Sequence, residues 1–301
     1  MAQLFDHDRM RRALLGFLES LLQLILFSNA YIAFCAVIMC QTTALLFDLA
    51  LPRSLLAFVF AGTLGSYSLH WYLTDLPADL SPAGTQRLHW NQQHKKLLLL
   101  LFLVSALIGL RELYILKTYL YDLFPVVILA FLYTAPKLNF WPFLALRRIA
   151  ILKTAYLSMV WTYVTVGLPL LINATTNAPN GLRIFTWALT WFVFIYSIAF
   201  WFDYRDRSDD GKSKWLTLVS MLTNQQAQLF FRALVVIYMF SLVALFYQDV
   251  SPETLICLSL PMILLVLTSQ RLQSPLSDYA YYLYLDGLLM IPGLLMMTIG
   301  H

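Results

Sequence analysis

The side chains with the clearest potential for chemistry are three aspartates in one charged segment, Asp203, Asp206 and Asp210. On a helix that advances about 100° per residue, these positions fall within roughly 60° of one another and share a face. Carboxylates crowded on one face repel each other, so the pattern indicates a compensating divalent cation or a ring of bases. Oxygen-only ligands, with no Cys or His among them, favour Mg²⁺ held together with phosphate oxygens of a substrate.

A second acidic pair lies earlier in the chain, where Asp75 and Asp79 have the i, i+4 spacing of one helical face. Pro77 disfavours helix between them, so we expect the helix to end near Asp75 and to leave Asp79 on a loop. Both acidic clusters also have a simpler interpretation as interfacial charge, the later one neutralised by nearby bases. Those bases are Arg205, Arg207, Lys212 and Lys214.

The elements that carry these acids are predicted to cross a membrane. Of 301 residues, 60% are apolar and 12% are charged, and the mean hydropathy is +0.70, unlike soluble globular proteins. A helix needs about 20 apolar residues to span roughly 30 Å of hydrocarbon. Nine segments meet this need: 13–40, 54–74, 97–116, 118–135, 149–171, 184–202, 226–247, 252–269 and 280–299. The sequence therefore predicts an all-α integral membrane protein, one helical domain over 1–301 with about nine transmembrane helices.

The basic residues predict how the bundle is oriented, because cytoplasmic loops retain Lys and Arg. With a cytoplasmic N-terminus, the opposite side holds only three of the 20 basic residues, Arg53, Lys117 and Arg183. The acidic loops near 70–96 and 203–225 then both face the cytoplasm. The bases form no stripe for nucleic acid. We expect the inner (cytoplasmic) membrane of a bacterium as the location.

Taken together, the acidic loops resemble those of the UbiA superfamily of intramembrane prenyltransferases, which carry aspartate-rich motifs after the second and sixth spans. The second motif of that family, D-x-x-D-x-x-x-D, is matched by Asp203, Asp206 and Asp210. A glycine-and-lysine stretch leading to Thr-Leu follows in the family, and it stands here at 211–218. The resemblance covers the chain from the first predicted span to the ninth.

Further positions extend the resemblance. Tyr133 and Lys137 are similar to a Tyr and Lys pair at the end of the family's fourth span, and Arg147 and Arg148 precede the fifth. The first motif, N-D-x-x-D-x-x-x-D, is matched only in part. Trp71 and Tyr72 stand in place of its leading Asn and Asp, and the Asn-Arg-Pro run that usually follows is missing. An unusual substrate or a loss of catalysis is compatible with this departure.

The resemblance implies Mg²⁺-assisted departure of diphosphate from an allylic prenyl diphosphate, followed by alkylation of an aromatic or lipid-like acceptor. It assigns metal binding to five aspartates, of which all but Asp79 also count as catalytic: Asp75, Asp79, Asp203, Asp206 and Asp210. It assigns substrate binding to Tyr133, Lys137, Arg147, Arg148 and Lys212.

Two polar residues inside predicted spans complete the candidate substrate-binding set. Asp286 lies about seven residues, or roughly 10 Å, into the ninth span, and Asn29 lies in the first. An ionisable group at such depth is costly and generally faces the interior or a wet cavity. Asp286 could contact the acceptor, or it could pair with Lys153, Arg232 or a backbone group. Asn29 has the same two interpretations.

These observations favour a Mg²⁺-dependent prenyltransferase that joins a prenyl diphosphate to a hydrophobic acceptor of quinone-precursor type, among membrane lipids. A non-catalytic relative that binds isoprenoid or quinone lipids, or scaffolds partner proteins, is the first alternative because of Trp71 and Tyr72. A transporter is the second, because of membrane-embedded charges such as Asp286 and Lys153. The sequence indicates no particular protein partner.

Overall fold

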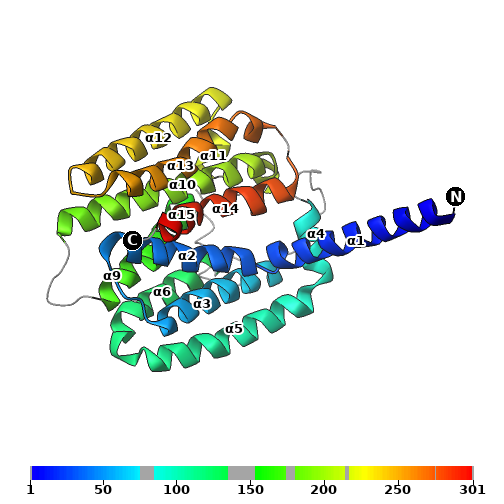
Figure 1. Cartoon of the computed structure of the whole chain (residues 1–301), viewed down its shortest axis with the longest axis horizontal. Coiled ribbons are helices and arrows are strands. Elements are labelled where there is room, and N and C mark those ends of the chain that lie inside the picture. Colours follow the sequence, from blue (N-terminus) through cyan, green and yellow to red (C-terminus); the bar gives the residue numbers. More distant parts are fainter. Residues whose placement is uncertain are drawn as a thin grey trace.

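The computed structural model of the protein describes residues 2–74, 85–134, 153–173, 180–213, 217–274 and 276–299. Within these ranges it does not describe the side chains of 2–9, 12, 13, 85, 134 and 208–213. Every regular element in this part of the chain is a helix, which confirms the predicted all-α class. Figure 1 shows the long helices side by side in one bundle, with α1 projecting beyond it at one end.

The first half of the bundle is built around α3, which packs along α5 and against α2. The short helix α4 contacts α1, α3 and α5. The helices of this half are α1 (Ala2–Phe27), α2 (Ala30–Phe47), α3 (Arg53–Tyr72), α4 (Thr85–Gln93), α5 (Lys95–Ile115) and α6 (Leu120–Thr134).

The second half is built around α10, which packs against α8 and α12. Two π-helical turns, Tyr163–Gly167 and Ala280–Leu285, interrupt its helices. Such turns often occur at functional sites. The helices of this half are α8 (Lys153–Thr162), α9 (Leu168–Ile172), α10 (Gly181–Ser213), α11 (Leu218–Met221), α12 (Asn224–Phe246), α13 (Pro252–Thr268), α14 (Asp286–Leu288) and α15 (Ile291–Ile299).

Five helices of the described chain are long and apolar enough to cross a bilayer: α2, α5, α8 with α9, α10 and α12. A sixth candidate is the pair Ala280–Leu288 and Ile291–Ile299, which is bent by 47°. The segments Leu14–Phe27 and Pro252–Thr268 are apolar but shorter. Each predicted span thus contains a helix, and composition and helix length together identify an integral membrane protein. The number of nine spans stays a prediction.

The first predicted span, 13–40, is wrong as a single helix. The chain breaks at Asn29, which has a φ of 71° in the left-handed region, and α2 then runs from Ala30 to Phe47. Asn is one of the few residues that adopt this conformation readily. The apolar composition continues through the break, so periodicity alone could not locate it.

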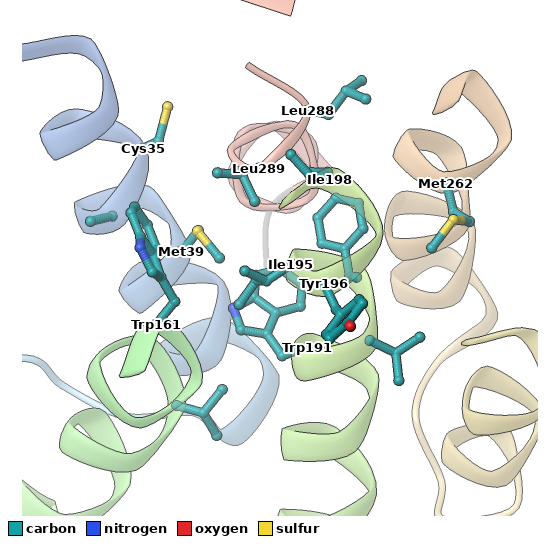
Figure 2. Close-up of a cluster of buried hydrophobic side chains, with 14 of the residues drawn as sticks. Cys35, Met39, Trp161, Trp191, Ile195, Tyr196, Ile198, Met262, Leu288 and Leu289 are labelled. Carbon is teal, nitrogen blue, oxygen red and sulfur yellow. The ribbon is translucent and has the colours of Figure 1, made fainter. Parts of the chain in front are cut away.

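The core centres on α10, because 67% of the residues in its apolar 18-residue segment are buried. Trp187, Trp191 and Trp201 on this helix are at most 1% exposed. Figure 2 shows side chains of α2, α8, α10, α13 and α14 converging there, among them Met39 and Trp161. In the corresponding segment of α5 only 17% of the residues are buried, as expected for a helix on the lipid-facing side of the bundle.

Candidate functional site

The three predicted metal ligands of the second motif lie on a helix. Because α10 continues to Ser213, Asp203, Asp206 and Asp210 occupy one helical edge instead of the predicted loop near 203–225. The loop prediction is therefore wrong as far as residue 213. Charged residues are compatible with helix in this stretch, and no proline interrupts it. The side chains of Asp210 and Lys212 lie outside the described residues.

Asp203 is held by the first turn of α8. The hydroxyl of Thr154 donates a hydrogen bond to Asp203 Oδ2, and Thr154 is buried. Lys153, the preceding residue, contributes positive charge at the same place. One oxygen of the Asp203 carboxylate therefore has a fixed position at the junction of α8 and α10.

Asp206 is paired with its neighbour Arg205. Arg205 Nε lies 2.7 Å from Asp206 Oδ1, and Nη2 lies 3.3 Å from Oδ2. This contact agrees with the interpretation that bases of the same segment neutralise its acids. The side chain of Asp206 is nevertheless 48% exposed, whereas that of Arg205 is 7% exposed. Asp206 therefore remains accessible to a ligand from outside the helix.

Arg205 also connects α10 to the segment before α14. Its Nη1 lies 3.5 Å from Asp278 Oδ1, and its Nη2 donates to the hydroxyl of Tyr282 at 3.1 Å. The Asp278 side chain is 1% exposed. A buried carboxylate of this kind is stable only with such partners.

Arg87 on α4 joins Arg205, Asp278 and Tyr282 in one polar cluster. Its backbone amide donates to Asp278 Oδ2 at 2.8 Å, and its Nη2 donates to Asn29 Oδ1 at 2.5 Å. Its guanidinium carbon lies 4.5 Å from the ring centre of Trp71 and 3.9 Å from that of Tyr282. Aromatic faces at these distances stabilise a cation. Trp71, which is predicted to stand in place of the Asn of the first motif, thus contacts an arginine.

Sequence reasoning did not assign Arg87, Thr154 or Asp278 to the site. Arg87 was only one of several loop bases, and Asp278 lies just before the ninth predicted span. An acid placed at the start of an apolar run was the available signal for Asp278. The pairing of Arg87 with Asp278 joins residues 191 positions apart, so local spacing could not reveal it.

Asn29 and Asp286 both lie close to this cluster. Asn29 is fully buried, and its amide donates to Ser68 Oγ at 3.3 Å while its oxygen accepts from Arg87. The basic charges that act on Asp286 are those of Arg87 and Arg205. The alternative pairing of Asp286 with Lys153, Arg232 or a backbone group stays a prediction.

Tyr133 lies at the end of α6, where its ring stacks on His70 of α3 with centroids 5.4 Å apart. The remaining predicted site residues, Asp75, Asp79, Lys137, Arg147 and Arg148, lie outside the described residues. Among the side chains that the structure does describe, no three His, Cys, Asp or Glu residues gather as a metal site. Of the predicted metal ligands, Asp203 and Asp206 are those with described side chains.

An apolar cavity of about 520 Å³ lies between α2, α3, α5, α6 and α8. This volume is typical of small-molecule sites. Its walls include Tyr67, Tyr133, Leu157 and Trp161. Leu157 and Trp161 follow Thr154 by three and seven positions on α8, so they share its helical face. The same face of α8 therefore contacts Asp203 at its first turn and lines the cavity about 5 to 10 Å further along.

A larger hollow of about 910 Å³ lies between α10, α12 and α13. Trp201, Arg232 and Gln270 line it, and its described wall contains none of the predicted site residues. The smaller cavity is lined by α8, the helix that also binds Asp203 through Thr154. It is therefore the better candidate for a substrate site.

Comparison with known proteins identifies the fold. No family model and no curated protein matches the sequence. The structure is similar to the apo structure of a UbiA homolog from Aeropyrum pernix K1, with a TM-score of 0.65 and 15% sequence identity. The match covers 89% of this chain and 97% of that chain. The helical bundle therefore has the fold of that UbiA homolog, as the aspartate motif predicted.

Proposed function

We propose that the protein is an intramembrane prenyltransferase, which transfers an isoprenoid chain from a polyprenyl diphosphate to a hydrophobic acceptor of quinone-precursor type. The supporting observation is that one face of α8 contacts the acidic edge of α10 and also lines the apolar cavity. Thr154 binds Asp203, and Leu157 and Trp161 on the same face of α8 line the cavity. A charged head and an apolar chain of one substrate fit this arrangement.

Asp203 and Asp206 would hold Mg²⁺, together with Asp210, Asp75 and Asp79. The two described carboxylates fit this role, because they are hard oxygen donors on one helical edge and Asp206 is half-exposed. When bound, the ion supplies positive charge that stabilises a diphosphate leaving group. Lys137, Arg147, Arg148 and Lys212 would contact the same diphosphate.

The cavity walls would protect the reacting carbon. Tyr67, Tyr133 and Trp161 present aromatic surface inside an apolar enclosure. Such surface excludes water, and aromatic faces stabilise developing positive charge on an allylic carbon. Asp286 and Asn29 stay in the proposal as acceptor-side residues, and Tyr133 stays as a substrate-binding residue.

The test is Mg²⁺-dependent release of pyrophosphate from a prenyl diphosphate by the purified full-length protein. Asp203→Asn and Asp206→Asn should each lower the rate by roughly 100-fold, as expected when an electrostatic contact to a transition state is lost. Asp249→Asn is the matched control. Asp249 is exposed with a φ of 60°, a conformation that Asn tolerates, and it lies beyond the far end of α12.

A non-catalytic relative that binds isoprenoid lipids is the second candidate. Trp71 stacks on Arg87, and Asp206 is paired with Arg205. Trp71 and Asp206, one position from each predicted motif, therefore already make contacts within the protein. Saturable binding of a prenyl diphosphate without pyrophosphate release would favour this candidate over the enzyme.

A further inference from the structure

The larger hollow, between α10, α12 and α13, contains a basic residue at a depth where a charge is costly. Arg232 lines this hollow and follows the start of α12 at Asn224 by eight residues, or roughly 12 Å of helical rise. In a helix that crosses hydrocarbon, an arginine at such a position generally pairs with an anion or reaches toward the interface. The described wall of the hollow contains no acidic residue, so it offers this charge no counter-ion.

The wall that α12 contributes changes from polar to apolar along the helix. Gln228 lies one turn before Arg232, and Val235 and Val236 lie three and four residues after it. These spacings place the four side chains on one face of α12, and all four line the hollow. The end of the hollow near the start of α12 is therefore polar and basic, and the part further along is apolar.

The wall that α13 contributes has the same polarity at each end. Residues 247–251 join α12 to α13, and the two helices pack side by side and antiparallel (Figure 1). Val266 and Leu267 line the hollow just before α13 ends at Thr268, and Ser269 and Gln270 line it just beyond that end. The end of α13 therefore places polar groups opposite the beginning of α12.

The polar end of the hollow is held together from inside, whereas its outer side is open. Gln228 Nε2 donates a hydrogen bond of 2.9 Å to Gln273 Oε1, which connects α12 to the turn after α13. Trp201 of α10, which is 1% exposed, closes the inner side. Val236 and Leu267 are 51% and 72% exposed. The hollow therefore opens at a surface that would face hydrocarbon in a spanning bundle.

We propose that this hollow binds an anionic phospholipid of the surrounding membrane, with the phosphate at Arg232 and the acyl chains along the apolar part. The N–H groups of an arginine bind phosphate oxygens, and glutamine amides can donate further hydrogen bonds. The predicted orientation places this end of α12 on the cytoplasmic side, where basic pockets between transmembrane helices bind anionic headgroups. The proposal goes beyond the transfer reaction, because the described wall contains none of the predicted catalytic or substrate-binding residues.

The charge of the hollow favours a lipid over a second copy of the chain. A twofold contact through this face would bring two copies of Arg232 toward each other, because such an interface uses the same surface on both subunits. Like charges repel when they are brought together away from water. A phospholipid instead supplies one negative group and two apolar chains, which match the two ends of the hollow.

The test is thermal unfolding of the purified full-length protein in detergent, because a ligand that binds the folded state raises the unfolding temperature. Dioleoyl phosphatidylglycerol carries a net negative charge. Dioleoyl phosphatidylcholine has the same chains and phosphate but no net charge. We expect half-maximal stabilisation of the wild type at a roughly tenfold lower concentration of phosphatidylglycerol, as for one additional charge-assisted contact. A wild type without this preference would overturn the proposal, whatever the variants do.

Arg232→Gln removes the charge but keeps a polar side chain, and it should fold because a neutral residue in a span costs less than a charged one. We expect this variant to need about tenfold more phosphatidylglycerol, with little change for phosphatidylcholine. Arg53→Gln is the matched control, because Arg53 is exposed at the start of α3 and does not line the hollow. An equal loss in both variants would show only general attraction between charges, and would overturn the site.

Two further measurements distinguish other occupants. Inorganic phosphate that stabilises the wild type as well as phosphatidylglycerol does, and through Arg232, would show a site for free anions. A dimer in detergent that Arg232→Gln dissociates, as measured by light scattering, would show an interface between copies. Either result would overturn the lipid site. None of these measurements needs turnover, so absence of prenyl transfer would remove the proposed function and leave this test intact.

Discussion

The buried carboxylate of Asp278 accepts a hydrogen bond of 2.8 Å from the backbone amide of Arg87. Its other oxygen lies 3.5 Å from Arg205 Nη1, so one side chain connects the start of α4 with the end of α10. A carboxylate near the first amides of a helix is also favoured by the helix dipole. Asp278 therefore joins the two regions that carry the acidic motifs.

Asp278→Asn should destabilise the protein, because it leaves the buried guanidinium of Arg205 with less compensating charge. Loss of one partner from a buried ion pair costs about 3 kcal/mol or more. We expect a clear fall in the unfolding temperature of the protein in detergent. Asp249→Asn, at an exposed position, should leave that temperature unchanged. Equal stability of the two variants would show that Asp278 does not hold the cluster together.

Arg87 and Asn29 should be energetically coupled. Arg87→Lys removes the planar guanidinium that donates to Asn29, and Asn29→Ala removes the acceptor. In a double-mutant cycle measured by unfolding, we expect a coupling energy of about 1 kcal/mol or more.

The control is a second double-mutant cycle, which combines Asn29→Ala with Arg183→Lys. Arg183 donates to the backbone of Leu46, near the other end of α2, which is about 25 Å from Asn29 by helical rise. Asn29→Ala and Arg183→Lys should therefore be additive. Additivity in the Arg87 cycle as well would contradict the role assigned to the Asn29 contact.

Thr154 should act as a positioning residue for Asp203. Thr154→Val keeps the shape of the side chain but removes the hydroxyl donor, and Thr154→Ser retains that donor. A hydrogen bond to a charged group contributes about 1.5–3 kcal/mol. We therefore expect roughly a tenfold rise in the Mg²⁺ concentration needed for half-maximal pyrophosphate release in Thr154→Val. Thr154→Ser should restore the wild-type value; if it does not, the hydroxyl is not what orients Asp203.

The predicted orientation can be checked with introduced cysteines, because the native Cys35, Cys40 and Cys257 are buried. Tyr247 is 81% exposed beyond the end of α12, and Gln86 is exposed on α4 at the opposite end of the bundle. In intact cells, a membrane-impermeant maleimide should label Tyr247→Cys, and should label Gln86→Cys only after permeabilisation. The reverse pattern would place the N-terminus outside.

The sequence was a good guide where the signal was local. Asp203 and Asp206 lie on one edge of α10, as the i, i+3 spacing indicated, and the apolar segments are helical. The boundary of α10 was misplaced because a rise in charge was interpreted as the end of a helix. Helical hydrogen bonding does not require apolar side chains, so the helix continues into the charged stretch.

The sequence did not predict features that depend on residues far away along the chain. The break at Asn29 is held by Arg87, 58 positions later, and an apolar run gives no sign of such a partner. For Asp286 the sequence suggested bases inside spans or a backbone group as partners. Arg87 and Arg205, the charges of which act on it, lie on α4 and α10, far from Asp286 along the chain.

The location of Asp278 also sets an order for biogenesis. The ribosome adds this residue 191 positions after Arg87, just ahead of the last helices. Until those helices emerge and enter the bilayer, the nascent chain lacks the carboxylate that Arg205 and the backbone amide of Arg87 share. The acidic end of α10 can therefore reach its final arrangement only after the segment that carries Asp278 has been synthesised.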